Sequence, residues 1–155
     1  MANWRVLRIR SDIDLADMLN GAVASAVDIQ NGVNIDGLTL VIDAGAGSKT
    51  VTFAPAKGRL WTPEEIVAQI AAADVSLANI PKIRRAAIAV RGGTPTYLKL
   101  FKDATTTITL KSTGTANSLF GWSIVVDTVG EPFTEDDVYS RIDYHDQHWY
   151  VVVYK

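Results

Sequence analysis

A glycine-rich segment that ends in lysine and threonine is the first candidate for chemistry in this sequence. Residues 45–50 read GAGSKT, close to the phosphate-binding loop of nucleotide-binding proteins. That loop needs Gly, four free positions, then Gly-Lys-Ser/Thr, and a helix directly afterwards whose N-terminus completes the anion site. Here Asp43 and Ser48 replace the two glycines, and the alternating residues 50–53 (TVTF) predict a strand. We therefore interpret the segment as the turn of a β-hairpin.

Both histidines of the chain fall into one polar stretch. His145 and His148 are flanked by Asp143 and Asp146, and imidazole and carboxylate groups both suit divalent metal ions. The stretch also precedes a predicted strand, where polar residues collect for solvation alone. We favour the exposed turn over the metal site, and we expect neither a bound metal nor a cofactor.

An acidic triplet is the next candidate for acid and base chemistry. Glu135, Asp136 and Asp137 lie in the first turn of a predicted helix, where the helix dipole favours negative charge. No serine lies in a nucleophile elbow of the Gly-x-Ser-x-Gly kind. The chain has no cysteine, which excludes disulfides, thiol catalysis and cysteine-bound metals. The sequence therefore predicts a protein that is not an enzyme, with a hydrolase built on His145 as the weaker alternative.

Basic residues are densest in the middle of the chain. This region could contact nucleic acid phosphate or acidic charge on a neighbouring subunit, although a solvated sheet face is the favoured interpretation. A net charge of −2 gives no general reason to expect nucleic acid or an anionic membrane as a partner. Arg84 and Arg85 are retained as interface candidates. The members of the region are Lys82, Arg84, Arg85, Arg91, Lys99 and Lys102.

Aromatic residues supply further candidates for an interface. The chain has four tryptophans and five tyrosines, more than burial alone needs to explain. Such side chains contribute a large contact area with a polar tip, so they serve well as anchors between proteins. The aromatic interface candidates are Trp4, Trp122, Trp149, Tyr150 and Tyr154.

The strands and helices expected to position these residues indicate an α+β fold. We predict an antiparallel, β-rich single domain spanning residues 1–155. It would contain a β-hairpin, an amphipathic helix, further strands and an N-terminal helix, with residues 1–32 as an N-terminal strand and helical arm. Alternation of apolar and polar residues is the signal for the strands. The predicted strands are 4–9, 38–43, 50–53, 85–90, 96–101, 106–112, 123–129 and 149–155.

Helix signals are strongest over residues 61–74. Thr62 can cap the helix, Pro63 fits its first position, and Glu65 can complete a capping box. A second helix is predicted over 11–32 from apolar residues spaced by three and four. A third, short helix is predicted to begin in FTEDDVYSRI, residues 133–142.

The N-terminal residues alternate apolar and basic side chains, which does not resemble a secretory signal. No run approaches the ~20 apolar residues that a membrane span needs. We therefore expect a soluble protein made in the cytoplasm, with no membrane partner.

Three sequence motifs follow one another between residues 38 and 122: LTLVIDAGAGSKTVTF, WTPEEIVAQIAAA and YLKLFKDATTTITLKSTGTANSLFGW. This order resembles a repeat of structural proteins of tailed bacteriophages and of inserts in flagellin and hook-associated proteins. In that repeat, a strand pair with "vdG…tvtf" leads to a "T-x-e-e-v-a-a-I" helix, then to strands ending "l-x-S-x-t-G", then to "aNs-l-l-G". The residues at matching places are Asp43, Val51, Thr52, Phe53, Thr62, Ile70, Ser112, Thr115, Ala116, Asn117, Leu119 and Gly121.

The chain departs from the repeat in two places. Ala44 stands where the repeat has glycine, and the helix ends in Ala71–Ala73 and Asp74 without the customary asparagine. Flagellar proteins add long coiled-coil helices at both ends, for which this chain has no matching segment. The resemblance therefore implies a phage virion protein that is made in the host cytoplasm and assembles as repeated subunits.

Its place in the particle could be the tail, the baseplate, the head-to-tail collar or the capsid decoration. Its partners would be identical subunits and other virion proteins. The alternative function is a particle-borne or secreted carbohydrate-binding adhesin, in which Trp122, Trp149 and the tyrosines stack on sugar rings.

Overall fold

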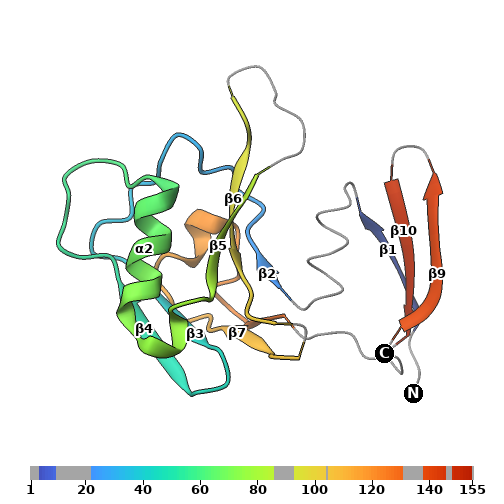
Figure 1. Ribbon diagram of the computed structural model, residues 1–155. Coiled ribbons are helices and arrows are strands. Elements are labelled where there is room, and N and C mark those ends of the chain that lie inside the picture. Colours follow the sequence, from blue (N-terminus) through green and yellow to red (C-terminus); the bar gives the residue numbers. More distant parts are fainter. Residues whose placement is uncertain are drawn as a thin grey trace.

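The computed structural model describes residues 4–9, 22–85, 93–103, 105–130, 138–145 and 148–154, with only backbone pairing described for 4–9, 138–145 and 148–154. The fold is α+β, as the sequence predicts. Its described strands form three antiparallel sheets, and the described residues include one α-helix (Figure 1).

The largest sheet has four strands and contains the predicted hairpin. Leu40 and Ile42 are fully buried on β3, while their neighbours along the strand are only partly buried. Val51 on β4 lies opposite Leu40 and is also fully buried, so alternation fixes the register of the hairpin. The strand order is β4 (Ser48–Thr52), β3 (Thr39–Asp43), β7 (Ile108–Leu110) and β8 (Thr128–Gly130).

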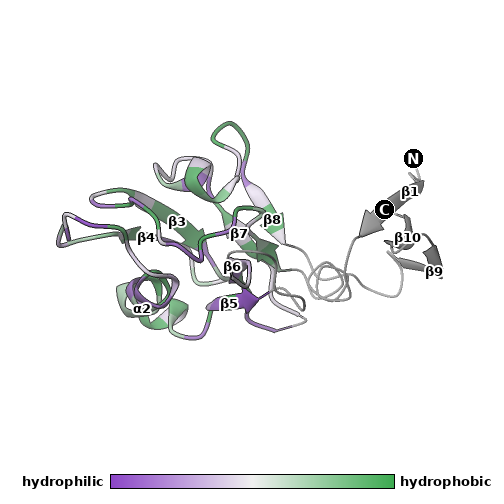
Figure 2. Ribbon diagram, turned by 90° about the horizontal axis from the view of Figure 1, so that it is seen from above, coloured by the Kyte–Doolittle hydropathy of each residue, from purple (hydrophilic) through white to green (hydrophobic). Residues whose placement is uncertain are grey.

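A second sheet has three strands and one polar face. Leu98 and Leu100 on β6 point into the core, whereas Tyr97 and Lys99 alternate with them on the other face. Figure 2 shows β5 in purple and β3 in green, a contrast that follows the many basic residues of β5. The strand order is β2 (Val23–Ala24), β6 (Thr96–Leu100) and β5 (Pro81–Arg85).

Helix α2 (Pro63–Ala73) packs against β4, β5 and β6 and so closes the core between the two sheets (Figure 1). Its capping box is confirmed. Thr62 Oγ1 accepts a hydrogen bond from Glu65 N–H at 3.2 Å, and Glu65 Oε2 accepts one from Thr62 N–H at 2.9 Å. Ile66 and Ile70 are fully buried, which anchors the apolar face of the helix.

The third sheet joins the strands nearest the two ends of the sequence. β1 (Trp4–Ile9) pairs with β10 (His148–Tyr154), which also pairs with β9 (Val138–His145). Trp4 lies opposite Tyr154 in this antiparallel register. The predicted strands at 4–9 and 149–155 are therefore confirmed over the described residues.

The predicted helix over 11–32 is wrong in its second half. Residues 10–21 lie outside the described part of the chain, and from residue 22 onward the backbone forms β2 and turns. Ser25 N–H donates to the Leu98 carbonyl at 2.8 Å, which continues the pairing of β2 with β6. Tertiary pairing with β6 thus outweighs the helical spacing of the apolar residues.

The predicted helix over 133–142 is also wrong in its described part. Residues 131–137, which include the acidic triplet, lie outside the described residues, and β9 begins at Val138. Val138, Ile142 and Tyr144 recur at even spacing, so the same residues fit a strand. Pairing with the apolar β10 decides in favour of the strand.

Two predicted strands are only partly as expected. For 85–90, Arg85 ends β5 and residues 86–92 lie outside the described part. For 123–129, only the last two residues belong to β8, and residues 124–126 form a bend.

A buried asparagine joins β7 to the segment that leads to β8. Asn117 opens the 3-10 helix η2 (Asn117–Phe120) and is fully buried. Its Nδ2 donates to the Lys111 carbonyl at 2.8 Å and to the Ser123 carbonyl at 3.0 Å. Gly121 ends η2 with φ of 77°, a left-handed conformation that favours glycine. Both residues lie in the segment whose sequence resembles the phage repeat, and here they fix the chain between β7 and β8.

Replacing Asn117 with alanine should lower the free energy of unfolding by about 1–3 kcal/mol, because two backbone carbonyls would lose the hydrogen bonds that the buried Asn117 side chain donates. Chemical denaturation followed by circular dichroism measures the change. Ser118→Ala is the matched control, since Ser118 is exposed in the same short helix and should change stability by less than about 0.5 kcal/mol. Equal stability of the Asn117→Ala protein and the unmodified chain would contradict this account of the motif.

Candidate functional site

The glycine-rich segment is a hairpin turn. β4 begins within it at Ser48, and no helix N-terminus is present at this place to bind phosphate. Gly45 and Gly47 have φ of 90° and 82°, the left-handed region that suits glycine in tight turns. Lys49, the lysine of the apparent motif, lies with its Nζ 3.5 Å from Asp74 Oδ2. The hairpin prediction is thus confirmed.

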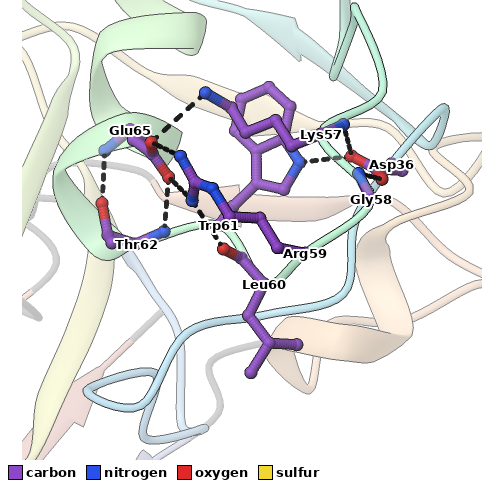
Figure 3. A network of polar contacts seen from close by, with 8 residues as sticks. All are labelled: Asp36, Lys57, Gly58, Arg59, Leu60, Trp61, Thr62 and Glu65. Carbon is purple, nitrogen blue, oxygen red and sulfur yellow. Dashed lines mark hydrogen bonds and ion pairs between the residues drawn. The ribbon is translucent and has the colours of Figure 1, made fainter.

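A polar network holds the exposed loop between β4 and α2 (Figure 3). Asp36 accepts three hydrogen bonds: from Trp61 Nε1 at 2.6 Å and from the backbone N–H groups of Lys57 and Gly58 at 2.8 Å each. These bonds, those from the Lys57 backbone foremost, lower the pKa of Asp36. Trp61 is 2% exposed and packs edge-on against Phe53, so the carboxylate pins the loop to the core.

Glu65 ties the same loop to the start of α2 (Figure 3). Both terminal nitrogens of Arg59 donate to its carboxylate, at 2.6 and 3.0 Å, and Lys57 Nζ lies at 3.2 Å. The hydrogen bonds from Arg59 are the main reason that the pKa of Glu65 falls well below its usual range. Lys57 Nζ also lies 4.5 Å from the centre of the Trp61 ring. The charged groups of this network are paired with one another, and the pairs fix the loop between β4 and α2 in place.

The basic region divides between two faces of the β2–β6–β5 sheet. Lys82 lies opposite Lys99, and Arg84 lies opposite Tyr97, so these four side chains share the polar face. The guanidinium carbon of Arg84 is 4.9 Å from the centre of the Tyr97 ring. The side chains on this face are half-buried, and like charges directly opposite each other destabilise a sheet unless something compensates them.

The other basic residues lie elsewhere. Arg85 faces α2, and its Nη2 is 3.1 Å from Glu64 Oε1 in an exposed ion pair. Lys102 is exposed after β6, and Arg91 lies outside the described residues. The structure therefore brings together about half of the basic region that the sequence nominates, and the interface role of Arg84 and Arg85 stays a prediction.

Among the aromatic candidates, Trp122 is the one whose side chain the structure describes. It is 7% exposed, its ring centre is 5.1 Å from that of Phe120, and its Nε1 donates to the Ala24 carbonyl at 3.1 Å. This placement leaves little of the indole for a sugar or a protein partner. The other candidates lie on β1 and β10, where only the backbone is described: Trp4, Trp149, Tyr150 and Tyr154.

The two histidines end neighbouring strands of one hairpin. His145 is the last residue of β9, His148 is the first of β10, and the two are direct partners in the register. Asp143 lies two positions before His145 on β9, and Asp146 lies outside the described residues. No group of three or more potential metal ligands was found among the described residues. The preference for an exposed turn over a metal site stays a prediction.

An exposed apolar loop is the surface feature that the sequence analysis missed. Ile124, Val125 and Val126 are 66%, 82% and 64% exposed, and Val129 on β8 is 49% exposed. The run reads as part of a strand because β-branched residues favour strands. The sequence signal that could have revealed the loop is the polar residue at its start, Ser123. Its Oγ accepts hydrogen bonds from the N–H groups of Val125 and Val126, both at 3.1 Å, and so bends the chain.

Asp127 fixes the far end of this loop. Its Oδ1 accepts from Ser112 N–H at 2.8 Å, and its Oδ2 lies 3.1 Å from Lys111 Nζ. The hydrogen bond from the Ser112 backbone and the contact with Lys111 lower the pKa of Asp127. The loop is thus held at both ends while its apolar side chains face water.

None of the helices in the described part of the chain has the length and apolarity needed to cross a bilayer. Comparison with protein families, with curated proteins and with solved structures found no match to this chain.

Replacing Asp36 with asparagine should lower the thermal midpoint at neutral pH and reduce its dependence on pH. Because the folded pKa of Asp36 is lowered, the ionised group stabilises the fold above its unfolded pKa, and this contribution is lost as the pH falls below about 4. Thermal unfolding between about pH 7 and pH 2 measures both effects. Asp43→Asn is the control, since the Asp43 side chain accepts a hydrogen bond from Gly45 N–H alone. The same pH profile in both variants would contradict the role of Asp36.

Calorimetric titration of the purified chain with zinc or nickel should give no heat beyond dilution, because we interpret His145 and His148 as residues of a solvated hairpin end. Saturable binding that disappears in a His145→Ala, His148→Ala double variant would overturn this interpretation in favour of a metal site.

Proposed function

We propose that this chain is a non-enzymatic structural protein of a tailed-bacteriophage particle, assembled as repeated subunits through contacts of its outer surface. The observation that carries the proposal is the exposed apolar loop at 124–126, which is fixed in position by its own polar neighbours. A contiguous apolar patch on a soluble domain marks a place of contact with another surface.

The polar clusters of the described residues support this proposal. Asp36, Glu65, Asp74 and Asp127 each accept hydrogen bonds that hold a loop or a helix end. Catalysis needs an acid, a base or a nucleophile aimed at a substrate. Carboxylates whose oxygens are used inside the fold suit a scaffold better than a reaction centre.

The segment whose sequence resembles the phage repeat has the same character. Thr62 caps α2, Asn117 bonds two backbone carbonyls, and Gly121 supplies a left-handed turn. The Thr115 hydroxyl accepts from Thr39 N–H at 2.8 Å and so links the motif to β3. Residues with these roles maintain the conformation of the backbone. A fixed backbone conformation suits subunits that pack against one another in a particle.

The proposal covers the tail, the baseplate, the head-to-tail collar and the capsid decoration as positions in the virion. Its partners would be identical subunits and other virion proteins. The carbohydrate-binding alternative loses Trp122 as a stacking residue, because that side chain is buried. Its other residues, Trp149, Tyr150 and Tyr154, lie on β10, where only the backbone is described.

Antibody raised against the purified chain should label gradient-purified particles of the phage that encodes it, and quantitative mass spectrometry should find several copies per particle. Repeated subunits predict a copy number in a fixed ratio to a known symmetric component of the particle. Recovery of the chain from the soluble lysate alone, with none in the purified particles, would contradict the proposal. Particles carrying the chain as a single copy would contradict the repeated-subunit part.

A further inference from the structure

We propose that Asn31 is a site of spontaneous covalent modification, where the backbone isomerises to isoaspartate and loosens the loop between β4 and α2. This inference goes beyond the proposed function and does not depend on it. Asn31 is exposed, and Gly32 follows it directly. Asparagine supplies an electrophilic side-chain carbonyl, and glycine supplies the least hindered backbone nitrogen because it has no Cβ.

The reaction joins two neighbouring groups of the chain and needs only water. The backbone nitrogen of Gly32 attacks the side-chain carbonyl carbon of Asn31. The proton of that nitrogen passes to the side-chain amide, which leaves as ammonia, and a five-membered succinimide ring remains. Water then opens the ring. Cleavage at the side-chain carbonyl gives aspartate, whereas cleavage at the main-chain carbonyl gives isoaspartate, in which the backbone is one carbon atom longer.

The fold requires glycine at position 32. Gly32 has φ of 89°, in the left-handed region that side chains disfavour. A Cβ at this position would lie 2.9 Å from Leu60 Cβ and 3.0 Å from the Trp61 carbonyl oxygen. A larger residue would shield the reacting nitrogen, but it could enter only if the neighbouring loop moved. The same packing that fixes the turn therefore keeps the reactive pair in place.

The turn that carries Asn31 is closed by a local hydrogen bond. Residues 30 and 31 form the turn, and Gly32 N–H donates to the Ile29 carbonyl at 2.9 Å. The nitrogen can attack only when this bond opens, so the folded chain should react more slowly than the unfolded chain. Exposed turns open at a much lower free-energy cost than the core of a protein. Local opening of the turn thus allows the reaction in the native state.

The other asparagines of the described residues lack this combination. Asn34 and Asn79 are exposed, but an isoleucine follows each of them, Ile35 and Ile80. A β-branched side chain crowds the backbone nitrogen that would have to attack. Asn117 is fully buried, and its amide is held by two backbone carbonyls. Exposure and a following glycine coincide at Asn31 within this part of the chain.

The additional carbon would lie next to the contact that holds the loop between β4 and α2. Val33 and Trp61 exchange two backbone hydrogen bonds, at 2.9 and 2.8 Å. The Trp61 indole also donates to Asp36, which accepts backbone N–H groups of the same loop (Figure 3). A longer backbone directly before Gly32 displaces that residue and strains the bridge from Val33 to Trp61. Isoaspartate should therefore loosen the loop.

Peptide-resolved mass spectrometry of the purified full chain, after incubation for several weeks at neutral pH, tests the modification. Labelling by an isoaspartate methyltransferase identifies the isomer. Asn31 should accumulate at least about tenfold more product than Asn34, because glycine follows it in place of isoleucine. Asn20 also precedes glycine and lies outside the described residues, so the chain should carry Asn20→Gln throughout. Equal modification of Asn31 and Asn34, or none at Asn31, overturns the inference.

Hydrogen exchange and thermal unfolding test the structural consequence. The isoaspartate form, separated by chromatography, should exchange the amides of Val33 and Trp61 faster and unfold at a midpoint lower by a few degrees. Fresh Asn31→Asp is the matched control, since it has the added charge with a backbone of normal length, and it should keep both properties. Asn31→Gln should not change on incubation. Equal losses in fresh Asn31→Asp, or unchanged exchange in the isoaspartate form, overturn the role of the lengthened backbone.

Discussion

The buried carboxamide of Asn117 is the interaction on which the connection between β7 and β8 depends. Its two N–H groups bond the carbonyls of Lys111 and Ser123, so the end of β7 and the start of the loop before β8 are fixed to one point. Because a buried amide without hydrogen-bond partners is costly, the Asn117 side chain favours this arrangement of the two segments. The position of β8, and with it the exposure of residues 124–126, follows from that constraint. One side chain thereby connects the end of β7 with the exposed apolar loop.

Carboxylates serve the rest of the fold in a comparable way. Asp36 and Asp127 accept backbone N–H groups from segments distant in sequence, and Asp103 accepts the hydroxyls of Thr105 and Thr106. Hydrogen bonds from Thr105 are the main reason that the pKa of Asp103 falls to about 2. Such groups stay ionised near neutral pH, where a general acid would need a raised pKa. Their electrostatics therefore agree with a scaffold, whose loops stay fixed without cysteine cross-links.

Local signals in the sequence were sufficient for α2 and for the β3–β4 hairpin. In α2 the cap, the proline and the apolar spacing all depend on residues within one or two turns, so they can be read without knowing the fold. Residues 22–32 and Val138–His145 required knowledge of their partners, because each segment carries a helix signal that pairing with β6 or β10 overrides. Alternation and helical spacing overlap in short apolar runs, and tertiary contacts then decide between them.

The candidate surface was harder to find than the fold for a related reason. An apolar run predicts burial, and the sequence does not state whether the burial happens inside the chain or against a partner. Val51 on β4 is fully buried by its neighbours, whereas Val125 is 82% exposed because Ser123 and Asp127 hold its loop outward. The difference lies in hydrogen bonds made by the flanking polar residues. Apolar runs bounded by serine and aspartate therefore merit attention as contact surfaces, since a polar bend at each end can turn a strand-like run toward solvent.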